Sequence, residues 1–197
     1  MVSAQSTGAG GKRRAAERAE HCPVTFLVPF ESNRRAHGFD LLSEPTRRLA
    51  LTSARNAGVM RASGRVVLVQ GEEGFLLFAP VHRLNSTAGS KEPRPATVAG
   101  FCVGVFRLRA IVEHALKSER REGLNLALFD ATQPGRASLL YFRSSAHPPE
   151  APPHEVPATA RGLEHRARLD VAGRSWLIVS TPSAGYRAAF PRWQSWS

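Results

Sequence analysis

Histidine and cysteine, the residue types that most often do chemistry in enzymes, are spread singly along this 197-residue chain. None of the seven histidines forms a His-Glu-x-x-His motif or stands beside paired cysteines, so no metalloenzyme signature is present. Two cysteines, Cys22 and Cys102, are too few for a zinc site, and a disulfide between them and two free thiols are both open. No Gly-x-Ser-x-Gly elbow marks a nucleophile. The sequence therefore predicts no catalytic residue, no metal and no cofactor.

Asp40 is the acidic residue in the most unusual setting, because it lies between Phe39 and Leu41 in an apolar stretch. A carboxylate there could anchor a ligand by accepting hydrogen bonds from it. The same carboxylate could instead cap a helix N-terminus, or pair with Arg34, Arg35 or Arg47. Both interpretations stay open on the residues alone.

The elements that would position such a site can be read from apolar runs and breakers. Ser43-Glu44-Pro45 predicts a helix start, and Gly58 predicts its left-handed end. Apolar residues from Leu108 to Leu116 recur at helical spacing. We expect strands where apolar runs end at turn residues, namely at 24–28, 66–70, 75–81, 100–107, 124–129, 138–142, 164–171 and 176–182. A terminal helical turn is expected within 183–193, and 147–157, with five prolines in 11 residues, is expected to be a surface loop.

This order of elements predicts an α+β fold, an antiparallel sheet flanked by helices. The length suits one core or two small lobes. Residues 1–14 resemble a disordered leader, and residues 15–197 the folded domain. No stretch reaches the roughly 18 consecutive apolar residues of a spanning helix, and no apolar segment of a secretory signal follows the basic cluster near Lys12. As written, the chain is expected to be cytoplasmic.

The formal charge is +11, which allows two interpretations. A strongly basic chain can bind nucleic acid. However, all but three of the 27 basic residues are arginine, and they are scattered, as a high-GC coding sequence would produce. Because no helix-turn-helix, zinc-finger or RNA-recognition signature occurs, we expect no nucleic-acid partner.

A series of short motifs in fixed order gives the chain a family resemblance. It resembles the C-terminal two thirds of a CHASE domain, the extracytoplasmic sensor of bacterial histidine kinases and diguanylate cyclases and of plant cytokinin receptors. The resemblance covers roughly residues 15 to 197 and implies a PAS-like lobe that is incomplete at the N-terminus. The motifs are Pro23-Val24-Thr25, Gly38-Phe39-Asp40-Leu41, Ser43-Glu44-Pro45, Gly74-Phe75-Leu76-Leu77-Phe78-Ala79-Pro80-Val81, Gly100-Phe101-Cys102-Val103-Gly104-Val105-Phe106 and Val171-Ala172-Gly173-Arg174-Ser175-Trp176.

The resemblance also implies a ligand site. In cytokinin receptors an aspartate in the matching segment hydrogen-bonds an adenine-like ring, and Asp40 holds that position. Other positions depart from those receptors: Ala62 replaces an apolar residue, and Gln70 or Gly71 replaces a threonine. The implied pocket would place Asp40 and Gln70 among apolar side chains, for each of which simple core packing is the alternative. Those side chains are Phe39, Leu68, Phe78, Phe101 and Val103.

The family further implies a sensor of an unidentified small molecule, without catalysis, in a larger membrane protein. An intact parent would carry flanking membrane helices, a histidine kinase or diguanylate cyclase output domain and a homodimeric, periplasmic sensor. Trp193 and Trp196 would suit the second membrane boundary. This chain is then a truncated form. The alternatives are a basic nucleic-acid-binding protein and a non-functional gene fragment.

Overall fold

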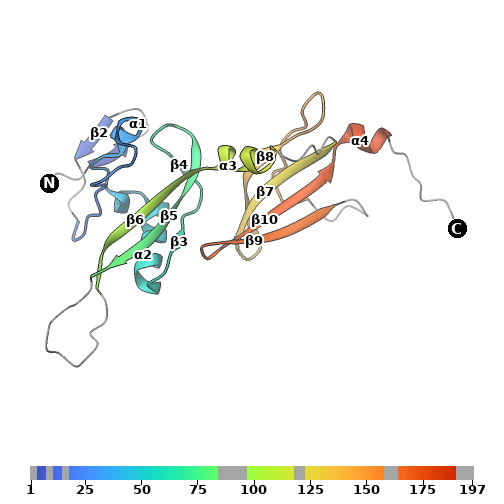
Figure 1. Cartoon of the computed structure of the whole chain (residues 1–197). Coiled ribbons are helices and arrows are strands. Elements are labelled where there is room, and N and C mark those ends of the chain that lie inside the picture. Colours follow the sequence, from blue (N-terminus) through green and yellow to red (C-terminus); the bar gives the residue numbers. More distant parts are fainter. Residues whose placement is uncertain are drawn as a thin grey trace. The chain divides into compact units, whose positions relative to one another are not determined.

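In the computed structural model the described residues are 4–7, 11–14, 18–83, 97–117, 123–157 and 164–189. The chain divides into two compact units, Met1–Arg107 (unit 1) and Leu108–Ser197 (unit 2). Both hold antiparallel strands and short helices, so the expected α+β class is confirmed (Figure 1). The strands of unit 1 and those of unit 2 belong to separate sheets.

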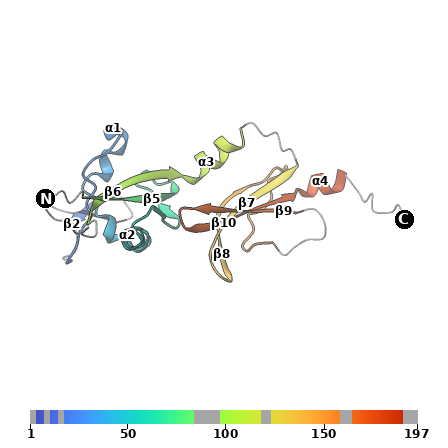
Figure 2. The ribbon, with the colours of Figure 1, turned by 60° about the horizontal axis from the view of Figure 1, so that its bottom comes forward.

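Unit 1 is built on the long strand β5 (Glu73–His82). On one edge β5 pairs with β6 (Val98–Arg107), and on the other with the short strands β3 (Arg61–Ala62) and β4 (Val66–Val67). Helix α2 (Pro45–Ala57) lies on one face of this sheet, where Ala50, Leu51 and Ala54 join Leu76 and Phe78 in the core (Figure 2). The remaining elements are α1 (Phe30–Asn33), η1 (Arg34–Ala36), η2 (Leu41–Ser43) and the pair β1 (Ala4–Thr7) and β2 (Gly11–Arg14).

The helix boundaries predicted for α2 are confirmed by its caps. Glu44 is the N-cap residue, and its carboxylate oxygens accept hydrogen bonds from the backbone N–H groups of Thr46 and Arg47, each at 2.9 Å. Pro45 occupies the first turn, where its missing N–H is not needed. Gly58 ends the helix with φ of 66°, a left-handed conformation that favours glycine.

One local expectation in unit 1 differs from the structure. The predicted strand at 24–28 is wrong: only Pro23 forms an isolated bridge, to Asp40, and Phe26 and Val28 are 92% and 97% exposed. Pro23 and Pro29 remove the N–H donors at both ends of this run, which weakens any ladder. Nearer the N-terminus, β1 and β2 pair antiparallel.

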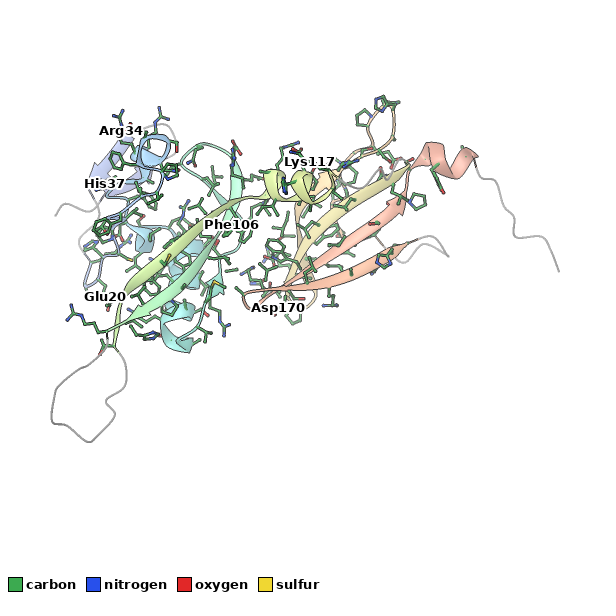
Figure 3. All side chains as sticks on the ribbon, viewed as in Figure 1. Glu20, Arg34, His37, Phe106, Lys117 and Asp170 are labelled. Atoms are coloured by element: carbon green, nitrogen blue, oxygen red, sulfur yellow. The ribbon has the colours of Figure 1, made fainter. Side chains whose placement is uncertain are left out.

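Unit 2 is a four-stranded antiparallel sheet in the order β8–β7–β10–β9. The strands are β7 (Leu124–Gln133), β8 (Arg136–Arg143), β9 (His165–Val171) and β10 (Arg174–Pro182), close to the predicted runs. Helix α3 (Leu108–Ala115) precedes the sheet and α4 (Ala184–Ala189) follows it. The predicted turn between β9 and β10 is confirmed: Ala172 and Gly173 have φ of 49° and 83°, and Asp170 (labelled in Figure 3) accepts a hydrogen bond from the N–H of Gly173 at 3.2 Å.

Candidate functional site

Asp40 ends a run of backbone pairing and begins the 3-10 turn η2, where its side chain is fully buried. Its Oδ1 accepts hydrogen bonds from the N–H of Cys22 at 2.9 Å and of Leu42 at 3.1 Å. Its Oδ2 lies 2.9 Å from Nδ1 of His21. Asp40 is therefore an N-terminal cap, one of the two roles that the sequence left open.

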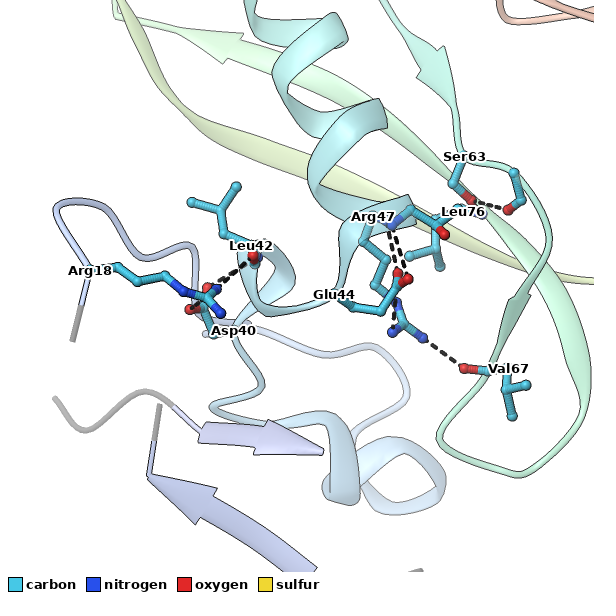
Figure 4. A network of polar contacts seen from close by, with 10 residues as sticks. Arg18, Asp40, Leu42, Glu44, Arg47, Ser63, Val67 and Leu76 are labelled. Carbon is cyan, nitrogen blue, oxygen red and sulfur yellow. Dashed lines mark hydrogen bonds and ion pairs between the residues drawn. The ribbon is translucent and has the colours of Figure 1, made fainter. Parts of the chain in front are cut away.

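The cationic side chain of Arg18 also lies beside this carboxylate. Nη1 of Arg18 is 3.9 Å from Oδ2 of Asp40 and donates to the carbonyl of Leu42 at 2.7 Å (Figure 4). Burial by itself raises the pKa of Asp40, but the hydrogen bonds from Cys22, His21 and Leu42 and the charge of His21 outweigh it, so the pKa is lowered. The carboxylate thus stays ionised in the folded chain at neutral pH.

The ion-pair partners of Asp40 are not the arginines that the sequence suggested. Arg34 and Arg35 lie exposed in η1, where Figure 3 labels Arg34, and Arg47 points elsewhere. Sequence reasoning missed Arg18 and His21 because both come from the segment before Cys22. The signal was available only in part: the Pro23-Val24-Thr25 motif overlaps residues 22–24, which pair with residues 38–41 and come directly after His21.

Five of the seven predicted site residues come together in one apolar cluster of unit 1, to which Leu41, the residue after Asp40, also belongs. Phe39, Leu68 and Phe78 are buried in one apolar cluster, and Phe101 and Val103 of β6 pack against it. The rings of Phe78 and Phe101 meet edge to face, with centroids 6.4 Å apart. Gln70 is the exception: it is exposed, and its Nε2 donates to Oδ1 of Asn33 at 2.8 Å.

Arg47 is a further polar residue of this region that the sequence did not single out as a site residue. Its side chain is 10% exposed, its guanidinium carbon lies 5.1 Å from the centre of the Phe39 ring, and its Nη2 donates to the carbonyl of Val67 at 2.7 Å. It therefore ties α2 to β4 across the apolar cluster (Figure 4). Burial lowers the pKa of Arg47, and the nearby charge of Glu44 partly offsets this.

This arrangement suits binding better than covalent chemistry. Cys22 is a free thiol, and burial together with the charge of Asp40 raises its pKa, which disfavours the thiolate. Cys102 is also free and exposed on β6, so the two cysteines do not pair. What the site offers is an ionised hydrogen-bond acceptor, two basic groups and adjoining aromatic and aliphatic surface.

Unit 2 buries a carboxylate of its own. Asp130 in β7 is 6% exposed, and its Oδ2 accepts hydrogen bonds from Nε and Nη2 of Arg174 in β10, at 2.9 and 2.5 Å. Its Oδ1 accepts from the N–H of Thr132 at 3.1 Å and from Oγ1 of Thr132 at 2.5 Å. Arg174 belongs to the last of the sequence motifs. Its contact with Asp130 joins two paired strands of the sheet, so this residue of the motif has a structural role.

Comparison with known proteins agrees with this picture of a non-catalytic module. The CHASE domain family model matches residues 4–141, which span parts of both units. The chain is also 26% identical over 187 residues to the hybrid signal transduction histidine kinase A of Dictyostelium discoideum; the match covers 86% of this chain and 9% of that protein. The chain thus corresponds to a small part of the length of this relative.

CHASE domains are extracytoplasmic sensor modules of signalling proteins and are not themselves catalytic. Among the residues that the structure describes, no helix is long and apolar enough to cross a membrane. Trp193 and Trp196, which the sequence analysis placed at a membrane boundary, lie outside the described residues. The order of the motifs, the antiparallel α+β fold and a family match over most of its length together show that this chain belongs to the CHASE domain family.

Proposed function

We propose that this chain senses a small molecule that combines an apolar body with a hydrogen-bond donor. The observation that carries the proposal is the convergence of Phe39, Leu68, Phe78, Phe101 and Val103 in one apolar cluster, to which Phe39 and Leu41, the chain neighbours of the ionised Asp40, both belong. Apolar walls with a few polar groups are what binding sites for small ligands require. The donor on the ligand would recognise Asp40, and its body would contact the apolar cluster.

The two oxygens of Asp40 differ in how readily they could serve a ligand. Oδ1 is committed to two backbone N–H groups, which cannot leave without unfolding η2 and the segment at Cys22. Oδ2 is held by side chains: His21, 33% exposed, and Arg18, 27% exposed. A side chain can rotate away at small cost. We therefore assign Oδ2 as the ligand-facing oxygen, with a donor of the ligand replacing His21.

In the intact parent this sensor would sit between membrane helices, on the periplasmic side in a bacterium, and would act as a homodimer. A histidine kinase is the favoured output domain, because the relative from Dictyostelium is a hybrid histidine kinase. A diguanylate cyclase is the alternative. Ligand binding would shift the populations of two sensor conformations, by no more than its differential affinity for them.

The test is thermal melting of the purified chain with adenine, N6-substituted adenines and other amine-bearing heterocycles. A compound at about 100 times its Kd stabilises the fold by about 2.7 kcal/mol and raises the melting temperature. Asp40→Asn keeps one acceptor oxygen for the backbone N–H groups but removes the charge. We expect at least one compound to stabilise the wild type and to stabilise Asp40→Asn much less.

Glu31→Gln is the matched control, because Glu31 is an exposed carboxylate of the same unit. This variant should show the same ligand-induced rise in melting temperature as the wild type for every compound. If no compound raises the melting temperature of the wild type, donor-bearing ligands of this class are excluded. Equal shifts in the wild type and Asp40→Asn would exclude Asp40 as the recognition group.

A further inference from the structure

The loop that follows β8 in unit 2 is held at several points, of which Glu150 and Val156 serve different parts of the fold. It runs from Ser144 to residue 157 and is rich in proline, which restricts its backbone freedom. Glu150, near its middle, makes polar contacts with β7 and α4. Val156, near its end, packs on the apolar face of the sheet.

The Glu150 carboxylate joins two elements that are far apart in sequence. Its Oε2 accepts a hydrogen bond from Nδ2 of Asn125 at 2.7 Å, and its Oε1 accepts one from the N–H of Ala184 at 2.7 Å. Its own N–H donates to Oγ of Ser144 at 2.9 Å. A carboxylate whose two oxygens hold different elements fixes their relative position more firmly than a neutral group could.

Asn125 links Glu150 to the sheet, because it belongs to β7. It lies at the start of β7 and is 4% exposed. Its Oδ1 accepts hydrogen bonds from the N–H of Ser145 at 3.0 Å and from Oγ of Ser144 at 3.3 Å. The loop, β7 and α4 thus meet at one buried polar junction.

The start of α4 depends on this junction. The first N–H groups of a helix have no partner within it. Ser183 caps the N–H of Tyr186 at 3.3 Å and donates its own N–H to the carbonyl of Gly123 at 2.7 Å. The N–H of Ala184 is served by Glu150 alone among the described residues. α4 is the element through which the chain leaves the sheet after β10, so Glu150 fixes its first turn.

The other anchor of the loop lies on the apolar core of unit 2. Val156 packs against the cluster of Ala127, Phe129, Leu177 and Val179. The loop therefore covers part of this face while Glu150 holds α4. Any event that lifts Val156 from the face would pull on Glu150 through a short, proline-restricted segment.

We infer that residues 144–157 form a strap that couples the apolar face of the unit 2 sheet to the first turn of α4 through Glu150. When Val156 is seated, Glu150 holds Ala184 and α4 is fixed to β7. When Val156 is displaced, the carboxylate leaves Ala184 and α4 is released. This device is independent of any ligand at Asp40.

The test is amide hydrogen exchange of the full chain, read residue by residue over α4, β7 and β10. In Glu150→Gln only one side-chain oxygen is left to accept hydrogen bonds. In the wild type the two donors, Nδ2 of Asn125 and the N–H of Ala184, use one oxygen each. We expect the amides of α4 to exchange at least about tenfold faster, equivalent to about 1.4 kcal/mol of opening free energy. Glu155→Gln, an exposed neighbour in the same loop, is the matched control and should change nothing.

Val156→Ala distinguishes a strap from a simple cap. Val156 packs on the sheet. A strap predicts that this change nevertheless speeds exchange of the α4 amides, while amides in the middle of β7 and β10 stay protected. Ser144→Ala, which frees the N–H of Glu150, is a milder second variant and should act in the same direction. Unchanged α4 exchange in Glu150→Gln would overturn the inference. So would an effect of Glu150→Gln without one of Val156→Ala, or α4 exchange that rises only together with that of the whole sheet.

Discussion

Among the described residues, unit 1 buries Asp40 and unit 2 buries Asp130, and different groups hold these two carboxylates. Asp130 in unit 2 is held by Thr132 of its own strand, β7, and by the guanidinium of Arg174 in the paired strand β10. Asp40 in unit 1 is held by two backbone N–H groups and by His21 and Arg18, whose side chains are about a third exposed. Both acids are buried, and the side chains at Oδ2 of Asp40 are somewhat more exposed, at 27% for Arg18 and 33% for His21, than Arg174 beside Asp130, at 21%.

This difference separates a structural acid from a candidate recognition acid. The forked guanidinium of Arg174 and the donors of Thr132 occupy both carboxylate oxygens of Asp130, so neither oxygen is offered to a ligand. On the proposed function, a ligand would replace the partners of Asp40 at Oδ2 while Oδ1 keeps the turn in place. Burial alone does not mark a binding residue, and the proposal rests on which partners of the buried acid a ligand could replace. The predictions that follow test this contrast.

The largest effect is expected at Asp130. Asp130→Ala leaves the Arg174 guanidinium, 21% exposed, without its ion-pair partner at the sheet. Removing one partner of such a pair should lower the free energy of unfolding of unit 2 by about 3 kcal/mol. Urea unfolding followed by circular dichroism measures this. Glu155→Ala, an exposed change in the same unit, is the control, and a loss at Asp130 no larger than the control's would refute the structural role.

A smaller loss of unfolding free energy is expected when Asp40 is replaced, and its size should depend on the replacing residue. Asp40→Ala removes the acceptor of two backbone N–H groups and should cost about 2 kcal/mol. Asp40→Asn keeps one acceptor oxygen and should cost about half as much. The same urea titrations compare the two variants. Equal losses would mean that the charge, and not the cap on Oδ1, stabilises unit 1.

The N-cap Glu44 provides an intermediate case, because both its oxygens accept from backbone N–H groups but its side chain is 33% exposed. Glu44→Ala should lower the free energy of unfolding by about 1 kcal/mol. Chemical denaturation of this variant beside Glu31→Ala measures the cap alone. A loss as large as that of Asp40→Ala would show that burial adds nothing to the value of a capping carboxylate.

The sequence predicted what depends on local pattern. The caps of α2, the β9–β10 turn and most strands follow from Pro, Gly and apolar spacing, and they are where they were expected. Periodicity could not reveal that the run at 24–28 lacks a sheet partner, since pairing is a long-range property. Nor could it assign Arg18 and His21 to Asp40, because these contacts join residues about 20 positions apart through an irregular segment.

The site itself was predicted unevenly for the same reason. Apolar residues on strands and beside the helix converge because a core gathers them, so Phe39, Leu68, Phe78, Phe101 and Val103 were found together. Gln70 was expected through the family resemblance alone, and its turn carries it to the surface near Asn33. Whether a given apolar residue contacts a ligand stays a prediction, since core packing produces the same pattern.

The smallest effect concerns pH and tests the ionised state of Asp40. Its pKa is lowered from the ordinary 3.8 in the folded chain, so the unfolded chain binds the proton first as the pH falls. The contribution of this charge to stability is therefore complete above about 3.8 and is lost as the pH drops through the lower, folded-state pKa. Glu44 adds a loss of the same sign, because its pKa is lowered from 4.5.

The difference in unfolding free energy between the wild type and Asp40→Asn isolates the Asp40 part, since Glu44 is present in both. This difference should be constant near neutral pH and should shrink only below about pH 4. Denaturant titrations at a series of pH values, with Glu31→Gln as the control for removing one negative charge, measure it. A difference that instead changes between pH 5 and 7 would contradict the prediction, because a carboxyl whose pKa is lowered from 3.8 does not titrate in that range. In that case the charge of Asp40 would not set the response of unit 1 to pH.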